Sequence, residues 1–258
     1  MMDTSDKNGL LDLAIAAALV AGPKILSVYA EDFVVRRKND QSPVTLADEI
    51  AEAAILTMLE REAPDVVAIA EERTARRGSS EAAPSRFWAI DPLDGTKEFV
   101  ARNDEFTVNI GLIEDTLPVL GVVYAPALDL LYAAAGPGTA RRRVNGDFEA
   151  VSARRVPTEG AVVVHSRSHD KSPRIAEFVA QLPGAIRTVT GSAIKFCRLA
   201  AGDADIYPRF GPTMEWDTAA GQAILEAAGG SVSTLDGKRL TYGKPEFRNT
   251  GFIARGRG

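Results

Sequence analysis

The chain has 258 residues, and 30 Lys and Arg stand against 35 Asp and Glu, which gives a formal net charge of −5. This length suits one large domain or two smaller ones that share a core. The acidic balance argues against a general nucleic-acid-binding protein, which normally carries a basic face. With Cys197 as the single cysteine and only two histidines, neither an intrachain disulfide nor a Cys- or His-based zinc centre is expected.

The apolar stretch near the start, Leu10 to Val20, is too short to span a bilayer and contains Asp12. The residues before it, MMDTSDKNG, are net acidic and lack the basic region of a signal peptide. We therefore expect a cytoplasmic protein without a transmembrane segment.

Hydrophobic periodicity predicts two helices in the first part of the chain, at residues 10–31 and 46–62. In the second of these, the spacing places Leu46, Ile50, Ala53, Ala54 and Met58 on the buried face. Two short apolar runs, 66–70 and 87–90, are typical of buried strands, and each ends on acidic residues.

The polar, turn-rich segment 73–85 between those runs predicts a surface loop. Strands expected at 106–113, 119–124 and 130–135 are separated by Gly and Pro, which indicates an antiparallel meander. Residues 1–155 are therefore expected to form an α+β half.

Strands and helices alternate in the remaining part, residues 156–258, which predicts a smaller α/β half. The two halves are expected to fold as one continuous unit of mixed α/β (α+β) class. The expected elements are strands at 161–165 and 204–207 and helices at 172–181, 191–201 and 218–228.

The segment from Asp91 to Thr96 carries the clearest chemical signal. Pro92 prevents the strand from continuing, and Gly95-Thr96 forms a tight turn whose amides can open a helix and receive a phosphate oxygen. Asp91 and Asp94 flank this turn. Two carboxylates about 4 Å apart repel by roughly 4 kcal/mol at an effective dielectric near 20, so such a cluster with a phosphate requires divalent cations. Oxygen ligands favour Mg²⁺ or Mn²⁺ over zinc. An ordinary surface turn is the alternative on these residues alone.

Three acidic motifs in the same order resemble the inositol monophosphatase superfamily of Mg²⁺-dependent phosphatases, and the resemblance covers nearly the whole chain. The motifs are Glu71-Glu72, Asp91-Pro-Leu-Asp94-Gly-Thr96 and Glu215-Trp216-Asp217-Thr-Ala-Ala-Gly221. Five further segments resemble the CysQ-type 3′(2′),5′-bisphosphate nucleotidases of that superfamily: Ser42 to Asp48, Lys97-Glu98-Phe99, Ser166-Arg167-Ser168-His169, Gly191 to Cys197 and Tyr207 to Thr213.

The resemblance implies a layered αβαβα sandwich, with an antiparallel-sheet half that binds metal and a smaller α/β half that binds substrate. It also implies two or three Mg²⁺ ions, with Mn²⁺ as a substitute, and Asp91 as a bridge between ions. The implied metal ligands are Glu71, Asp91, the Leu93 carbonyl, Asp94 and Asp217.

The resemblance further implies that Asp48 and the Thr96 hydroxyl, together with Glu71, prepare the attacking water. The Gly95 and Thr96 amides would hold the scissile phosphate. The implied substrate-contacting residues are Leu93, Asp94, Gly95, Thr96, Ser166, His169, Ser192, Lys195 and Asp217. Each has a simpler alternative: Asp48 fits a capping box with Thr45, Asp217 fits a helix first turn, and His169 and Lys195 are commonly surface residues.

The implied activity is hydrolysis of the 3′-phosphate of adenosine 3′,5′-bisphosphate to AMP, and of 3′-phosphoadenylyl sulfate as a second substrate. An inositol-1-phosphate or histidinol-phosphate phosphatase is the alternative within the superfamily, and a non-catalytic metal-dependent binding protein is the alternative outside it. No nucleic-acid partner is expected, and the sequence leaves open whether the chain forms a homodimer. Inner-membrane association is implied only by the resemblance, because no basic amphipathic helix accompanies it.

Overall fold

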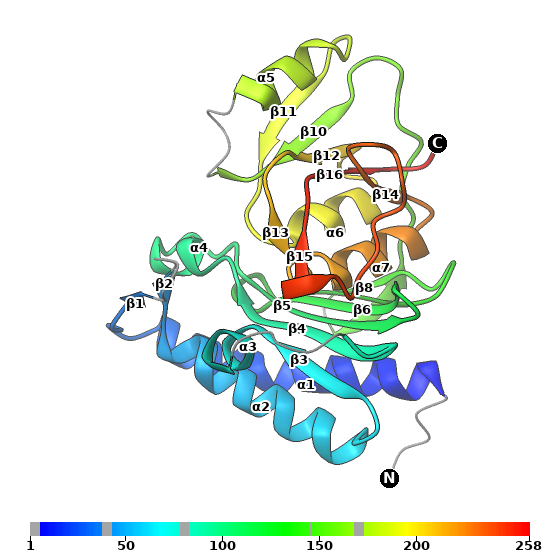
Figure 1. The fold of residues 1–258 in the computed structure, drawn as a ribbon. Helices are drawn as coiled ribbons and strands as arrows, with labels where there is room; N and C mark the ends of the chain where they lie inside the picture. The colour runs from blue at the N-terminus through cyan, green and yellow to red at the C-terminus, as the bar shows by residue number, and fades with distance from the viewer. Residues whose placement is uncertain (1–5, 38–42, 78–82, 145, 168–172) are drawn as a thin grey trace.

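The computed structural model describes residues 6–37, 43–77, 83–144, 146–167 and 173–258. Five layers follow one another in Figure 1: helices α1 and α2, a seven-stranded sheet, helices α6 and α7, a five-stranded sheet, and helix α5. The expected αβαβα sandwich of the α+β class is therefore confirmed. The helices are α1 (Lys7–Tyr29), α2 (Leu46–Glu62), α3 (Glu71–Arg77), α4 (Thr96–Val100), α5 (Pro173–Ala180), α6 (Ile194–Ala200) and α7 (Ala219–Ala227).

The first sheet has the strand order β3-β4-β5-β6-β7-β8-β9. Only β3 and β4 are parallel, and the expected antiparallel meander runs through β5, β6 and β7. Its strands are β3 (Val67–Ala70), β4 (Arg86–Asp94), β5 (Thr107–Glu114), β6 (Leu117–Ala125), β7 (Leu130–Ala135), β8 (Arg141–Val144) and β9 (Asp147–Ala150). The last two were not predicted, because β8 is arginine-rich, and β9 is only four residues long and fully exposed.

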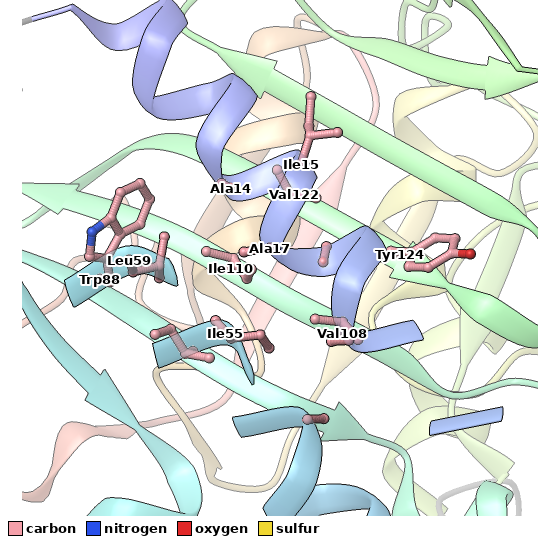
Figure 2. Close-up of a cluster of buried hydrophobic side chains, with 14 of the residues drawn as sticks. Ala14, Ile15, Ala17, Ile55, Leu59, Trp88, Val108, Ile110, Val122 and Tyr124 are labelled. Atoms are coloured by element: carbon pink, nitrogen blue, oxygen red, sulfur yellow. The ribbon is translucent and has the colours of Figure 1, made fainter. Parts of the chain in front are cut away.

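Successive side chains along each strand point to opposite faces of this sheet, so the sheet separates two hydrophobic cores. In β4, Trp88 and Ile90 face α1 and α2, whereas Phe87 and Ala89 face the layer of α6 and α7. Figure 2 shows the first of these cores, where side chains of both helices lie against β4, β5 and β6. The sheet is thus covered on both faces, and the ends of its central strands are held in fixed positions.

Helix α1 is long and apolar enough to cross a membrane by length and composition. Its apolar residues pack instead inside the molecule: Leu10, Ala14, Ala17 and Ala18 are fully buried in the core with α2 and the first sheet. Here α1 is a core helix, and it continues as a helix through Pro23.

Two local predictions are wrong. The buried face of α2 is formed by Ala47, Ala51, Ile55 and Leu59, whereas Leu46 is 53% exposed. The acidic residues Asp48 and Glu52 lie on this buried face, which a pattern of apolar residues does not reveal. The segment expected to be a loop from residue 73 belongs in its first part to α3.

The second sheet has the strand order β11-β10-β12-β16-β14, in which β10 is parallel to both of its neighbours and the remaining pairs are antiparallel. Helix α5 covers one face, with Phe178 and Val179 against Val163 and Ile206. Its strands are β10 (Val162–His165), β11 (Ile186–Val189), β12 (Ile206–Arg209), β14 (Ser231–Thr234) and β16 (Phe252–Arg255). The two-stranded pairs are β1 (Arg36–Arg37) with β2 (Pro43–Val44) and β13 (Thr213–Met214) with β15 (Arg248–Asn249).

Helix α7 lies between the two sheets and approaches the first one closely. A Cβ added at Gly121 of β6 would lie 2.3 Å from the Ala220 carbonyl oxygen, and one at Gly111 of β5 would lie 2.9 Å from the Ala219 Cβ. Small residues on both sides thus bring α7 against the sheet. This contact fixes the start of α7, and with it the acidic residue just before the helix, relative to the first half.

Candidate active site

One cavity of about 580 Å³ lies where the two halves meet. Most of the site residues expected from the sequence line it: Glu71, Asp91, Leu93, Asp94, Gly95, Thr96, Ser166, Ser192, Lys195 and Asp217. Asp48 lies directly behind the cavity wall, against Thr96. His169 lies outside the described residues. The chain therefore brings together side chains that are more than 100 positions apart in the sequence.

Three carboxylates form the centre of this cavity. Asp91, Asp94 and Asp217 each offer one oxygen, and these oxygens all lie within 4.8 Å of one another. The ladder between β4 and β5 is irregular between Asp91 and Asp94, and the Leu93 amide donates to Asp91 Oδ1 at 2.9 Å. The prediction that Pro92 ends the strand is wrong, because β4 continues through Pro92 to Asp94, and the shift in register between Asp91 and Asp94 lets both acids reach one point.

Burial, together with the negative charge of Asp94, raises the pKa of Asp217. Closely spaced buried carboxylates repel, and a divalent cation relieves that repulsion. A set of oxygen donors suits hard cations such as Mg²⁺ or Mn²⁺. The residues present therefore fit a divalent metal, with Glu71 at the first residue of α3 on the same cavity wall.

Asp217 is held in place from its own half of the molecule. The Met214 amide donates to Asp217 Oδ2 at 3.0 Å, and the Thr213 hydroxyl donates to the same oxygen. Both donors belong to β13, so the short β13–β15 pair orients this acid just before α7.

Asp94 is held from both halves. The Ser192 hydroxyl donates to Asp94 Oδ2 at 2.7 Å, and Asn109 Nδ2 donates to the same oxygen at 3.3 Å. Thr107 contacts the Ser192 hydroxyl and donates to Asn109 Oδ1 at 2.8 Å. Ser192, expected as a nucleotide contact, thus hydrogen-bonds one of the clustered acids.

Asp48 and Thr96 meet at the edge of the site. The Thr45 amide and hydroxyl both donate to Asp48 Oδ2 at 2.8 Å, which confirms the expected capping box. Thr96 Oγ1 lies 3.4 Å from Asp48 Oδ1 and 3.3 Å from the Leu93 carbonyl oxygen. Asp48 therefore uses one oxygen as a cap and directs the other at Thr96. Gly95 has φ +89°, a conformation that favours glycine.

Of the two adjacent acids at the end of β3, Glu71 lines the cavity, while Glu72 is only 5% exposed. The Glu72 amide donates to Glu52 Oε2 at 2.7 Å, and Arg76 pairs with the other Glu52 oxygen at 3.0 Å. Burial raises the pKa of Glu52. Glu52 therefore ties the start of α3, and with it the backbone of Glu71, to α2.

Two cationic side chains, Lys195 and Arg209, also line the cavity. Lys195 is only 3% exposed, and its ammonium donates to the carbonyls of Ser192 and Thr190, the latter at 3.3 Å. Arg209 lines the same cavity and donates to the Pro212 carbonyl at 3.1 Å, while its buried Nε has no hydrogen-bond partner among the described residues. Sequence reasoning singled out the segment around Arg209 but did not assign this residue a role.

Fold and site together define a class of protein. The chain belongs to the inositol monophosphatase family, whose model matches residues 6–254. It is 45% identical over 246 residues to the 3′(2′),5′-bisphosphate nucleotidase CysQ of Salmonella typhimurium, covering 94% of this chain and 98% of that protein. The CysQ protein of Escherichia coli (strain K12) is 43% identical with the same coverage.

Solved structures agree with this assignment. The crystal structure of CysQ from Bacteroides thetaiotaomicron, a bacterial member of the inositol monophosphatase family, has a TM-score of 0.81 and 36% sequence identity, covering 97% of this chain and 98% of that chain. An inositol monophosphatase from Anabaena has a TM-score of 0.74 at 29% identity, covering 97% of this chain and 91% of that chain.

Proposed function

We propose that this protein is a Mg²⁺-dependent 3′(2′),5′-bisphosphate nucleotidase of the cytoplasm. It would release the 3′-phosphate of adenosine 3′,5′-bisphosphate to give AMP, and act in the same way on 3′-phosphoadenylyl sulfate. The names of relatives at 43–45% identity support this choice.

The observation that carries the proposal is that the clustered acidic side chains and two cationic side chains line the same cavity. Asp91, Asp94 and Asp217 line this cavity together with Lys195 and Arg209, and the charge of Arg209 acts on Asp217 and Asp94. A substrate with two phosphates could place the scissile group at the acids, through bound cations, and the second group near Arg209. An inositol monophosphate has no second phosphate that Arg209 could bind.

The carboxylates of Glu71, Asp91, Asp94 and Asp217 and the Leu93 carbonyl would hold the metal ions. Bound Mg²⁺ supplies a lowered water pKa and stabilises charge on the leaving oxygen. Two or three ions are part of the proposal, and Mn²⁺ is the expected substitute.

Asp48 and Thr96 would handle the proton of the attacking water. Thr45 donates to Asp48 Oδ2, and the Thr96 hydroxyl lies 3.4 Å from the other oxygen, Asp48 Oδ1. The Thr96 hydroxyl would accept a hydrogen bond from the water and pass its own proton toward Asp48. Direct in-line attack on phosphorus follows, with the Gly95 and Thr96 amides on the phosphate and no covalent enzyme intermediate.

Phosphate release from four substrates tests this function: adenosine 3′,5′-bisphosphate, inositol-1-phosphate, histidinol phosphate and fructose-1,6-bisphosphate, each with Mg²⁺ and with a chelator. We expect kcat/KM to be at least about tenfold higher for the nucleotide, a difference of about 1.4 kcal/mol in transition-state binding. Higher efficiency on inositol-1-phosphate, or release that persists in chelator, would overturn the proposal.

Arg209→Ala sharpens the test. It should lower kcat/KM for adenosine 3′,5′-bisphosphate by about tenfold or more, since charged hydrogen bonds to phosphate contribute about 1.5–3 kcal/mol. The loss on inositol-1-phosphate should be smaller. Arg187→Ala, on the exposed edge strand β11, is the matched control. Equal losses on both substrates would remove Arg209 from recognition of the second phosphate.

A further inference from the structure

A second cavity of about 250 Å³ opens beside the first and shares three of its lining residues, Ser166, Tyr207 and Arg209. The rest of its lining comes from two places. Arg174 and Ile175 belong to α5, and residues 208–211 form the end of β12 and the turn after it. Among the described residues that line this cavity no carboxylate occurs.

The cavity lies at a break in the strand connections of the second sheet. The chain goes from β10 through α5 to β11 on one side, and then through α6 to β12 on the other side of β10. In open α/β sheets, ligands bind in the crevice at the carboxyl ends of strands where the connections diverge. Ser166 directly follows β10, and Phe210 directly follows β12, so both stand at that crevice.

The walls of this second cavity offer two flat groups, a guanidinium and an aromatic ring, and an apolar side chain. The Arg174 guanidinium lies 4.8 Å from the centre of the Phe210 ring. Phe178 contacts the same ring edge-on, with ring centres 5.9 Å apart, and thus supports it from α5. Ile175 is only 2% exposed and adds an aliphatic wall. Arginine planes and aromatic rings are the surfaces on which nucleobases stack.

We propose that this second cavity is the base pocket of the enzyme, and that Arg174 and Phe210 recognise the nucleobase while the phosphates occupy the first cavity. This inference rests on the proposed function. The volume supports it, because cavities for whole drug-sized ligands measure roughly 300–1,000 Å³ and this one suits a base alone. Ser166, Tyr207 and Arg209 line both cavities, so the ribose crosses between them at these residues.

Arg174→Ala and Phe210→Ala test the base pocket. Each should raise KM for adenosine 3′,5′-bisphosphate by about tenfold, in the range measured for base stacking on a single side chain, while kcat changes less than about twofold. The inhibition constant of inorganic phosphate, a product that carries no base, should stay unchanged. Arg174 is exposed, so its substitution should leave the fold intact, and Phe210→Leu keeps apolar volume without a ring. Arg187→Ala is the control for loss of a positive charge on the same sheet.

Calorimetric titration with AMP makes the outcome independent of turnover. If the wild-type protein binds AMP and Arg174→Ala weakens that binding but not the binding of phosphate, the base pocket stands even where hydrolysis of the bisphosphate fails. If the wild-type protein hydrolyses the bisphosphate and both variants keep its KM and the AMP affinity, the base pocket is wrong while the proposed function stands. Equal weakening of AMP and phosphate would also overturn it.

Discussion

The two halves of the molecule contribute to the cavity in different ways. The first half presents Asp91 and Asp94 at the end of β4, a strand of nine residues of which seven are buried. The second half presents its groups on connecting segments and at a strand end: Ser192 lies before α6, Asp217 lies between β13 and α7, and Arg209 is the last residue of β12. The acids of the first half are thus fixed by a sheet that is covered on both faces, whereas the groups of the second half lie at strand ends and on connecting segments.

Two sets of contacts join the halves at the site. Ser192 donates to Asp94, and Glu105 accepts hydrogen bonds from the Gly191 amide at 2.9 Å and from Arg167 at 2.6 Å. All the donors come from the second half and both acceptors from the first. We therefore expect substitutions of the clustered acids to lower turnover most, and substitutions of the donors that join the halves to change metal and substrate affinity more than turnover.

Asp94→Asn should have the largest effect. Asn keeps the size of the side chain and can accept from Ser192, but it removes one charge from the group that would bind the cations. We expect kcat to fall by about 10³-fold, which corresponds to about 4 kcal/mol, with an unchanged circular dichroism spectrum. Asp65→Asn, on the exposed turn before β3, is the control. Wild-type turnover at saturating Mg²⁺ would contradict the metal assignment.

Gly121→Val tests the packing between the halves. The new side chain would collide with the backbone of α7, because a Cβ there lies 2.3 Å from the Ala220 carbonyl oxygen. We expect a loss of about 3 kcal/mol in the free energy of unfolding, measured by urea denaturation. Activity should fall as well, since a shifted α7 displaces Asp217. Gly121 is not among the glycines with positive φ, so the expected loss reports this collision and not backbone strain.

Much of the fold could be predicted because its core elements carry strong apolar patterns. Strands β4 to β7 and helices α1, α2 and α7 all follow such patterns. Strand β8, with the sequence RRRV, has none, and it exists because β7 offers it an edge to pair with. Helix α3 is mostly charged and is held by Glu52, a contact that no local pattern reveals.

The site also contains residues that could be predicted from the sequence and residues that could not. Residue type and spacing pointed only to Asp91 and Asp94, whereas Glu71 and Asp217 were expected because their motifs resemble those of the family. The bond between Ser192 and Asp94 joins residues 98 positions apart, and it depends on how the second half docks. Arg174 and Arg209 are single arginines without a local pattern, and only the packing of α5 against the sheet that contains β12 brings them to one cavity.

Metal binding should stabilise the fold, because it relieves repulsion among Asp91, Asp94 and Asp217. At a Mg²⁺ concentration of about 100 times the dissociation constant, the free energy of unfolding should rise by about 2.7 kcal/mol. Asp94→Asn should lose most of that gain. Thermal unfolding with MgCl₂, and with NaCl at equal ionic strength, measures the difference. An equal shift with NaCl would mean that the acids bind no specific cation.

Ser192→Ala should have the smallest effect and is the most direct test of the link between the halves. It removes the 2.7 Å hydrogen bond to Asp94, while Ala and Ser are equally strained at the φ of +52° found there. Substitutions of groups that orient a metal ligand typically weaken metal binding 10- to 100-fold, so we expect the Mg²⁺ concentration for half-maximal activity to rise about tenfold, or about 1.4 kcal/mol. Maximal turnover at saturating Mg²⁺ should fall much less, because Asn109 still donates to the same oxygen.

Ser231→Ala, at an exposed position of β14, is the control for the loss of a hydroxyl. If Ser192→Ala instead lowers kcat and leaves the Mg²⁺ dependence unchanged, Ser192 acts on the substrate, as the family resemblance implies, and not on the position of Asp94.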